Sequence, residues 1–176
     1  EVNKIIFVGR LSPEKNLYNL IDAVTETDFV LDIYGQGPLR EALESYAIQK
    51  KAKVNFMGVV PNSELPQILN RYPYYILPSL SEGMPKTLLE AMACGLVCIG
   101  TNVTGINEVI EDGVNGYLAN GTDSIEIAKT ILKVSQNTSN VMTIKSRELI
   151  ETKYSLSAHL IREKEIFNNN FGKLCK

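Results

Sequence analysis

Short apolar runs alternate with longer amphipathic stretches over the first two thirds of the chain, and this alternation constrains the fold more than any other feature. Each run is rich in β-branched or aromatic residues and is followed by Gly, Pro or Ser, which is typical of buried strands. The six runs span residues 5–8, 29–34, 54–57, 74–77, 97–100 and 117–119. Because strands that alternate with helices form βαβ units, the sequence predicts an α/β fold with a doubly wound, six-stranded parallel sheet and helices on both faces.

Proline and glycine mark the ends of the predicted helices. The tripeptide Ser12-Pro13-Glu14 offers an N-cap, a first-turn Pro and an early acid, so a helix is predicted to begin there. Pro85 opens another predicted helix, and Gly95 closes it. After residue 122 the pattern becomes all-helical, with helices predicted at 123–136, 140–153 and 156–170. We therefore expect one domain over residues 1–176 with a helical C-terminal tail.

Composition excludes several classes of protein. A net charge of −2 over 176 residues argues against a nucleic-acid-binding surface, and no apolar run approaches the ~20 residues that a membrane span needs. The three cysteines form no Cys-x-x-Cys pair and the chain has one His, which favours reduced thiols in a cytoplasmic protein over a disulfide scaffold or a zinc site. Because the chain does not begin with Met, we expect it to be part of a longer polypeptide.

The loop after the first predicted strand carries two cations. It lacks both the Gly-x-Gly-x-x-Gly turn of dinucleotide sites and the Gly-Lys-Ser/Thr of a P-loop. It has instead Arg10 at the strand end and Lys15 about one helical turn into the next element. A guanidinium fork and an ammonium group at the carboxyl edge of the sheet suit a diphosphate. The alternative is a solvated Arg and an exposed helix Lys.

The loop after the fourth predicted strand is the most informative part of the chain. Because Pro85 starts the following helix, the N–H groups of Thr87 and Leu88 are expected to be free at its positive end, which makes an anion site. Glu82 lies just before this helix, where it either serves a ligand or complements the helix dipole. Glu90 has apolar neighbours, so we expect it to be buried and to need a polar partner; the alternative is a solvated acid.

These residues carry a family resemblance. Glu82 and Glu90, with seven residues between them, resemble the Glu-x7-Glu motif of the retaining glycosyltransferase family 4, the "group 1" glycosyltransferases of the GT-B fold. The stretches 7–15, 34–38, 54–58 and 105–117 resemble further segments of that family in the same order. One departure is Asn16, which stands where the family often has Gly after the phosphate-binding Lys.

The resemblance implies roles for individual residues. Arg10 and Lys15 would hold the diphosphate of the donor and stabilise it as the leaving group, and Glu82 would hold hydroxyls of the donor sugar near the reacting carbon. Glu90 would bind the ribose diol. The remaining nucleotide-sugar contacts would come from Met57, Gly58, Gly83, Met84, Pro85, Thr87 and Leu88. The implied donor is a UDP- or GDP-linked sugar, with no metal and no other cofactor.

The resemblance also implies what accompanies this chain. It covers the second, donor-binding half of a GT-B enzyme, so an N-terminal acceptor-binding domain would lie outside residues 1–176. The fragment alone would then be inactive, and the acceptor would be a glycan or a lipid-linked molecule. The full protein would be cytoplasmic, with any membrane contact made by the other half.

Two other interpretations of the function remain open from the sequence. One is half of a GT-B sugar-nucleotide epimerase, which shares the fold but matches the Glu82–Glu90 pattern less closely. The other is a non-catalytic α/β binding module such as a receiver domain. Receivers need acids after the first strand, where this chain has Gly9 and Arg10. An NAD-dependent oxidoreductase is weaker still, because the glycine fingerprint is missing.

Overall fold

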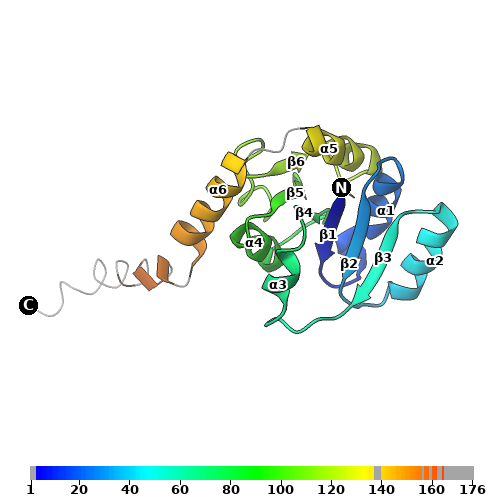
Figure 1. Cartoon of the computed structure of the whole chain (residues 1–176), viewed down its shortest axis with the longest axis horizontal. Coiled ribbons are helices and arrows are strands. Elements are labelled where there is room, and N and C mark those ends of the chain that lie inside the picture. The colour runs from blue at the N-terminus through cyan, green and yellow to red at the C-terminus, as the bar shows by residue number, and fades with distance from the viewer. Residues whose placement is uncertain (1–2, 137–139, 156, 159, 162–163, 165–176) are drawn as a thin grey trace, which may run out of the picture.

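A six-stranded sheet forms the centre of the chain (Figure 1). The computed structural model describes residues 3–136, 140–155, 157–158, 160–161 and 164. The sheet order is β3-β2-β1-β4-β5-β6, and each neighbouring pair is parallel. The strands are β1 (Lys4–Val8), β2 (Val30–Tyr34), β3 (Val54–Gly58), β4 (Tyr74–Leu77), β5 (Val97–Thr101) and β6 (Tyr117–Ala119). All six predicted strands are confirmed, and so is the Rossmann-like α/β fold.

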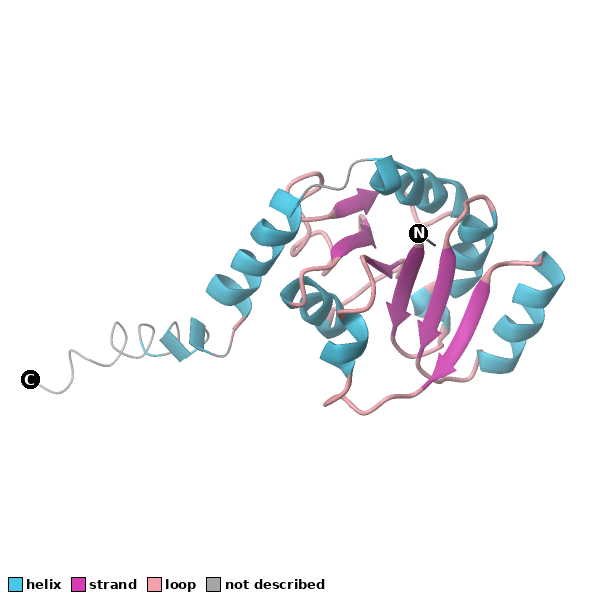
Figure 2. Cartoon of the chain, in the orientation of Figure 1, coloured by secondary structure: helices cyan, strands magenta, loops and turns pink. Residues whose placement is uncertain are grey.

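The helices form two groups around this sheet (Figure 2). Helix α1 packs against α2 and α5, whereas α4 packs against α3 and α6. The bounds are α1 (Leu17–Thr25), α2 (Arg40–Lys50), α3 (Leu65–Leu69), α4 (Lys86–Ala93), α5 (Ser124–Gln136) and α6 (Asn140–Leu149). This arrangement leaves the carboxyl ends of the strands at one edge, where parallel sheets bind ligands.

The sheet is buried at its centre and open at one edge. All residues of β4 and β5 are buried, as expected for strands with helices on both faces. Strand β3 lies at the edge of the sheet, and its Asn55 and Met57 are exposed. The prediction that the third apolar run is a buried strand is therefore wrong, because an edge strand has a neighbour on only one side.

The segment after β1 differs from the predicted helix. Residues Pro13–Lys15 form a 3-10 turn, and Ser12 makes no side-chain capping hydrogen bond. Asn16 then adopts a left-handed conformation with φ 58°, and α1 begins only at Leu17. Asparagine and glycine tolerate this conformation better than other residues, so Asn16 fits a position where the family often has Gly. Lys15 therefore ends the 3-10 turn and precedes α1.

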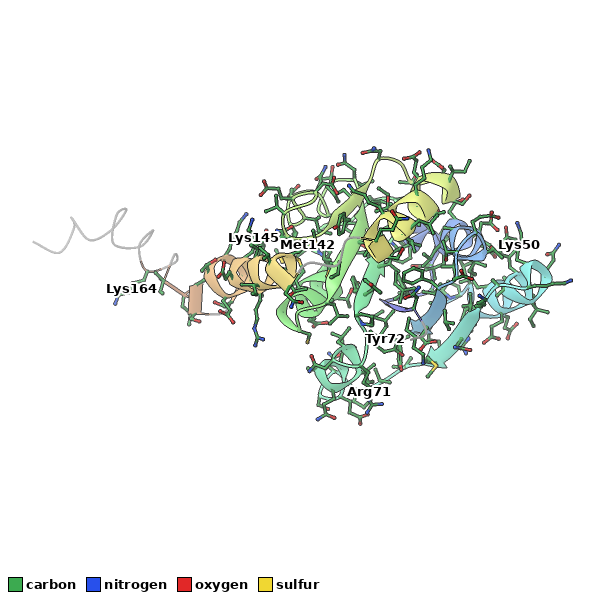
Figure 3. All side chains as sticks on the ribbon, turned by 45° about the horizontal axis from the view of Figure 1, so that its top comes forward. Lys50, Arg71, Tyr72, Met142, Lys145 and Lys164 are labelled. Atoms are coloured by element: carbon green, nitrogen blue, oxygen red, sulfur yellow. The ribbon has the colours of Figure 1, made fainter. Side chains whose placement is uncertain are left out.

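The C-terminal tail agrees with the prediction over two of its three helices. Helices α5 and α6 are present, but after Leu149 the chain changes to a π-helical segment, Ile150–Tyr154. Most of the third predicted helix, 156–170, lies outside the described residues. Leu160 and Ile161 are described and are 59% and 60% exposed. Figure 3 shows Lys145 and Lys164 along this tail, on the opposite side of the molecule from Lys50 on α2.

Candidate functional site

A cavity of about 370 Å³ lies at the carboxyl edge of the sheet. Its walls come from the ends of β1 and β2, from the loop after β3 and from the first turns of α4. The lining residues are Val8, Gly9, Arg10, Tyr34, Gly35, Gln36, Val59, Val60, Asn62, Leu65, Lys86, Thr87 and Glu90. Three predicted site residues, Arg10, Thr87 and Glu90, are brought together here although they come from two distant segments.

Close backbone packing fixes the loop that carries Arg10. The Gly9 N–H donates to the Tyr34 carbonyl at 3.0 Å, and the Leu11 N–H donates to the Gln36 carbonyl at 3.1 Å. Gly35 has φ +139°, and a Cβ atom added to it would lie 1.8 Å from the Gly9 carbonyl oxygen. Only glycine fits this contact. The two strand ends are thereby joined, while the Arg10 side chain remains exposed at the cavity.

The start of α4 offers backbone donors, of which Thr87 was predicted and Leu88 is not one. The Leu88 N–H donates to the Pro85 carbonyl at 3.0 Å, so the prediction that it is free is wrong. The turn that begins at Pro85 therefore already uses this N–H in its own hydrogen bond. Within the described residues, Gly83, Met84 and Thr87 have N–H groups with no backbone acceptor. These donors lie where the helix dipole is positive, so they can bind an anion.

Thr87 is anchored to the sheet below it. Its hydroxyl lies 2.8 Å from the hydroxyl of Tyr75, which is fully buried on β4. Burial raises the pKa of Tyr75 well above its ordinary value, so this phenol stays protonated. The contact fixes the first turn of α4 at the cavity wall.

Glu90 lines the cavity but is exposed, so the prediction that it is buried is wrong. Its apolar neighbours Leu88, Ala91 and Met92 face the core, whereas Glu90 lies on the opposite side of α4. Partial burial nevertheless raises the pKa of its carboxyl, and the charge of Lys86 opposes that rise. Lys86 precedes Glu90 by four residues and also lines the cavity, and the sequence reasoning missed it. The i, i+4 spacing was the available signal.

Glu82 and Lys15 form a separate, mostly buried ion pair. The Lys15 Nζ donates to Glu82 Oε1 at 2.5 Å, and their side chains are 18% and 10% exposed. The Ser79 hydroxyl donates to the same Oε1 atom at 2.6 Å. Neither charged residue lines the cavity at Arg10. The two cations of the first loop therefore have different surroundings, since Arg10 lines the cavity and Lys15 pairs with Glu82.

The other predicted contacts do not line the cavity. Met57 and Met84 are 49% and 64% exposed, and Pro85 is buried. Gly58 has φ +81°, and its carbonyl accepts the Gly35 N–H at 2.7 Å. The residues that follow, Val59, Val60 and Asn62, form the wall instead. The predicted base-binding residues Met57 and Gly58 therefore precede this wall, since β3 continues through Gly58 before the chain turns.

Cysteines and acids give no metal site in the described part of the chain. No group of three or more His, Cys, Asp or Glu residues there could hold an ion. Cys94 and Cys98 are free thiols, and burial raises the pKa of the Cys98 thiol. Within the same residues, no helix is both long enough and apolar enough to cross a bilayer.

Comparison with known proteins identifies the family. Residues 1–155 match the family described as glycosyl transferases group 1. The chain belongs to the glycosyl transferases group 1 family. The resemblance of the Glu82–Glu90 segment and of the strand-end loops is thereby confirmed at the level of the family. This member has the family's Rossmann-like sheet with an open carboxyl edge.

Three similar proteins illustrate the match. A UDP-Gal:alpha-D-GlcNAc-diphosphoundecaprenol alpha-1,3-galactosyltransferase of Escherichia coli is 28% identical over 176 residues, which cover 94% of this chain and 46% of that protein. The pneumococcal O-GlcNAc transferase GtfA, solved with UDP and GlcNAc, is 32% identical with a TM-score of 0.75, and the match covers 85% of this chain and 32% of that protein. The C-terminal domain of LpcC from Francisella tularensis shares the fold at 23% identity and a TM-score of 0.74, and the match covers 87% of this chain and 86% of that domain. The chain spans less than half the length of the curated relatives it matches.

Proposed function

We propose that this chain is the donor-binding half of a retaining glycosyltransferase that uses a nucleotide-diphosphate sugar. The observation that carries the proposal is the cavity at the carboxyl edge, where Arg10, Lys86 and Glu90 meet the N-terminus of α4. The E. coli relative uses a UDP-sugar by its name, and GtfA was solved with UDP and GlcNAc, which supports UDP as the nucleotide. A GDP-linked sugar is the alternative donor.

The cavity suits the three parts of a nucleoside diphosphate. Arg10 and the N–H groups at the start of α4 would bind the diphosphate, since a guanidinium fork and a helix N-terminus both bind phosphate oxygens. Glu90 would accept hydrogen bonds from the ribose diol. Val59 and Val60 offer an apolar wall for the base. Glu82 would face the sugar, and its partner Lys15 would reach the diphosphate.

The chemistry that we propose is transfer with retention. The bond between the anomeric carbon and the β-phosphate oxygen breaks, and the diphosphate leaves with the bonding electron pair. The acceptor oxygen forms its bond to the anomeric carbon on the same face, and its proton passes to the departing diphosphate. Cations and backbone donors around the diphosphate would stabilise the charge that develops there. We assign no protein nucleophile, no metal and no cofactor other than the donor.

The acceptor would bind outside this chain. We propose that an N-terminal domain supplies the acceptor groove, and that the product is a polysaccharide or glycoconjugate made in the cytoplasm. The separately crystallised LpcC domain is covered over 86% of its length, which supports treating residues 1–176 as one domain. This chain alone is then expected to transfer no sugar; turnover by it alone would contradict the assignment to one half.

Calorimetric titration of the chain with UDP, GDP, ADP and NAD tests the proposal. One nucleoside diphosphate is expected to bind, and Glu90→Gln is expected to weaken it about tenfold because a diol contact is lost. Glu111→Gln is the matched control, since Glu111 is an exposed acid outside the cavity. Selective binding of NAD, or equal affinity in Glu90→Gln, would contradict the proposed site.

A further inference from the structure

A buried serine holds the Glu82 carboxylate, to which the proposed function gives the donor sugar. Ser79 is fully buried in the loop after β4, and its hydroxyl donates to Glu82 Oε1 at 2.6 Å. The same oxygen accepts the Lys15 ammonium at 2.5 Å. Within the described residues, Glu82 Oε2 has no donor. One carboxylate oxygen is therefore held by two donors, and the other is left for a ligand.

The backbone around Ser79 is held from two further segments. The Thr101 hydroxyl, at the end of β5, donates to the Ser79 carbonyl at 2.5 Å. The Asn16 side-chain amide donates to the Pro78 carbonyl at 3.1 Å. Both Thr101 and Asn16 are buried. Because the peptide groups on both sides of Ser79 are fixed, its hydroxyl has a fixed direction toward Glu82.

The two donors to Glu82 differ in what else they can do. Lys15 carries a charge on a flexible four-carbon side chain, so it can turn toward a diphosphate when the donor binds. Ser79 is neutral, short and buried, so it has no such alternative. The serine bond would therefore keep the Glu82 carboxylate in place while the lysine is shared with phosphate.

We propose that Ser79 is a positioning residue, which orients Glu82 so that its Oε2 atom accepts hydroxyls of the donor sugar. The inference rests on the proposed function, because it requires a nucleotide-sugar at this edge of the sheet. It adds to that function the residue that sets the geometry of the sugar contact. Ser79 itself touches no substrate.

The test compares the affinity for a UDP-sugar with the affinity for UDP. UDP-glucose, UDP-galactose and UDP-GlcNAc are titrated into the chain, and the tightest of them is kept as the probe. Ser79→Ala is expected to weaken the probe about tenfold and UDP less than about twofold, because only the sugar contacts Glu82. Equal weakening of both ligands, or no change in either, overturns the inference.

Ser146→Ala is the matched control. Ser146 on α6 is also fully buried, and within the described residues its hydroxyl has no hydrogen-bond partner. The same substitution there is expected to leave both affinities unchanged. A loss of the probe in Ser146→Ala equal to that in Ser79→Ala would mean that loss of any buried hydroxyl disturbs the site, which overturns the inference.

A double variant separates positioning from packing. In Ser79→Ala/Glu82→Gln the loss of probe affinity is expected to equal that of Glu82→Gln alone, since Ser79 acts through Glu82. Additive losses overturn the inference. Ser79→Cys keeps a similar size with a weaker donor and replaces Ser79→Ala if the alanine variant does not fold. The affinity of Ser79→Cys for the probe is then expected to lie between the affinities of the wild type and of Glu82→Gln. An affinity equal to that of the wild type overturns the inference. If the unchanged chain binds neither UDP nor a UDP-sugar, the proposed function itself fails, and the wild-type titration alone reveals this.

Discussion

The Lys15–Glu82 pair and the cavity at Arg10 lie on the same edge of the sheet but are prepared differently. Lys15 and Glu82 are mostly buried, bonded to each other and held by Ser79. Arg10 and Glu90 are exposed at a cavity whose free donors are backbone N–H groups. The first region is ordered before any ligand arrives, whereas the second leaves its charged side chains to be ordered by the ligand.

The difference matches what each region would have to do. A group that acts where bonds break gains most from a fixed position, because reorganisation at that moment costs activation energy. A group that binds the nucleotide has to admit and release it, and exposed side chains around a rigid backbone frame allow that. Four experiments test whether the two regions differ in this way.

Gly35→Ala is expected to have the largest effect. The new Cβ would overlap the Gly9 carbonyl oxygen at 1.8 Å, and the backbone at φ +139° disfavours any side chain. We expect the free energy of unfolding to fall by more than about 3 kcal/mol, as measured by urea denaturation. Gly83→Ala is the control, since nothing lies within 4 Å of the Cβ that would be added there. Equal stability of the two variants would show that the cavity needs no rigid frame.

Lys15→Met is expected to cost about 2 kcal/mol of stability, because among the described residues it leaves the mostly buried Glu82 carboxylate with Ser79 as its one remaining side-chain donor. Lys15→Met/Glu82→Gln removes the unpaired charge and should recover part of that loss. Denaturation curves measure both. No loss in the single variant would mean that the Lys15–Glu82 region is not preordered, and the contrast with the cavity would disappear.

Arg10→Ala is expected to leave stability unchanged and to weaken UDP about tenfold while uridine binding stays the same. The reason is that exposed Arg10 would contact only the phosphates. Arg71→Ala removes another exposed guanidinium, near α3 (Figure 3), that does not line the cavity, and should change neither affinity. Equal losses of UDP and uridine in Arg10→Ala would make this loop a structural element.

The pH dependence of Glu90 should give the smallest effect. Because burial raises the pKa of its carboxyl, UDP binding should weaken as the pH falls through that raised value, where the ionised acceptor is lost. The stability of the fold changes in the opposite direction and rises as the pH falls. Ionised Glu90 costs stability above its folded pKa, and this cost vanishes below its unfolded pKa.

Glu90→Gln should therefore melt slightly higher than the wild type at about pH 8, with the gap closing toward about pH 4. Thermal melts and UDP titrations over this range provide the check. If the wild type were more stable than Glu90→Gln at high pH, the pKa of Glu90 would be lowered by folding instead of raised.

Much of the fold follows from local sequence pattern. The strand runs, the prolines and glycines at element ends and the alternation of strand and helix are enough to predict six parallel strands. The prediction fails for the buried third strand, the helix from Ser12 and the buried Glu90. In each case the deciding fact is a neighbour distant in sequence: the missing partner of β3, the carbonyls that Asn16 binds, and the side of α4 that faces the core.

The class of fold, the edge where a ligand would bind and the family motif that carries Glu82 and Glu90 can all be predicted without a structure. Apolar periodicity and turn residues act over a few positions, so they can be read without a structure. The tertiary structure was needed to show that Lys15 pairs with Glu82, that Asn16 binds the Pro78 carbonyl next to Ser79 and that Lys86 joins Arg10 at the cavity. Hydrogen bonds between segments more than sixty residues apart depend on how the strands are ordered in space, and no local pattern encodes that.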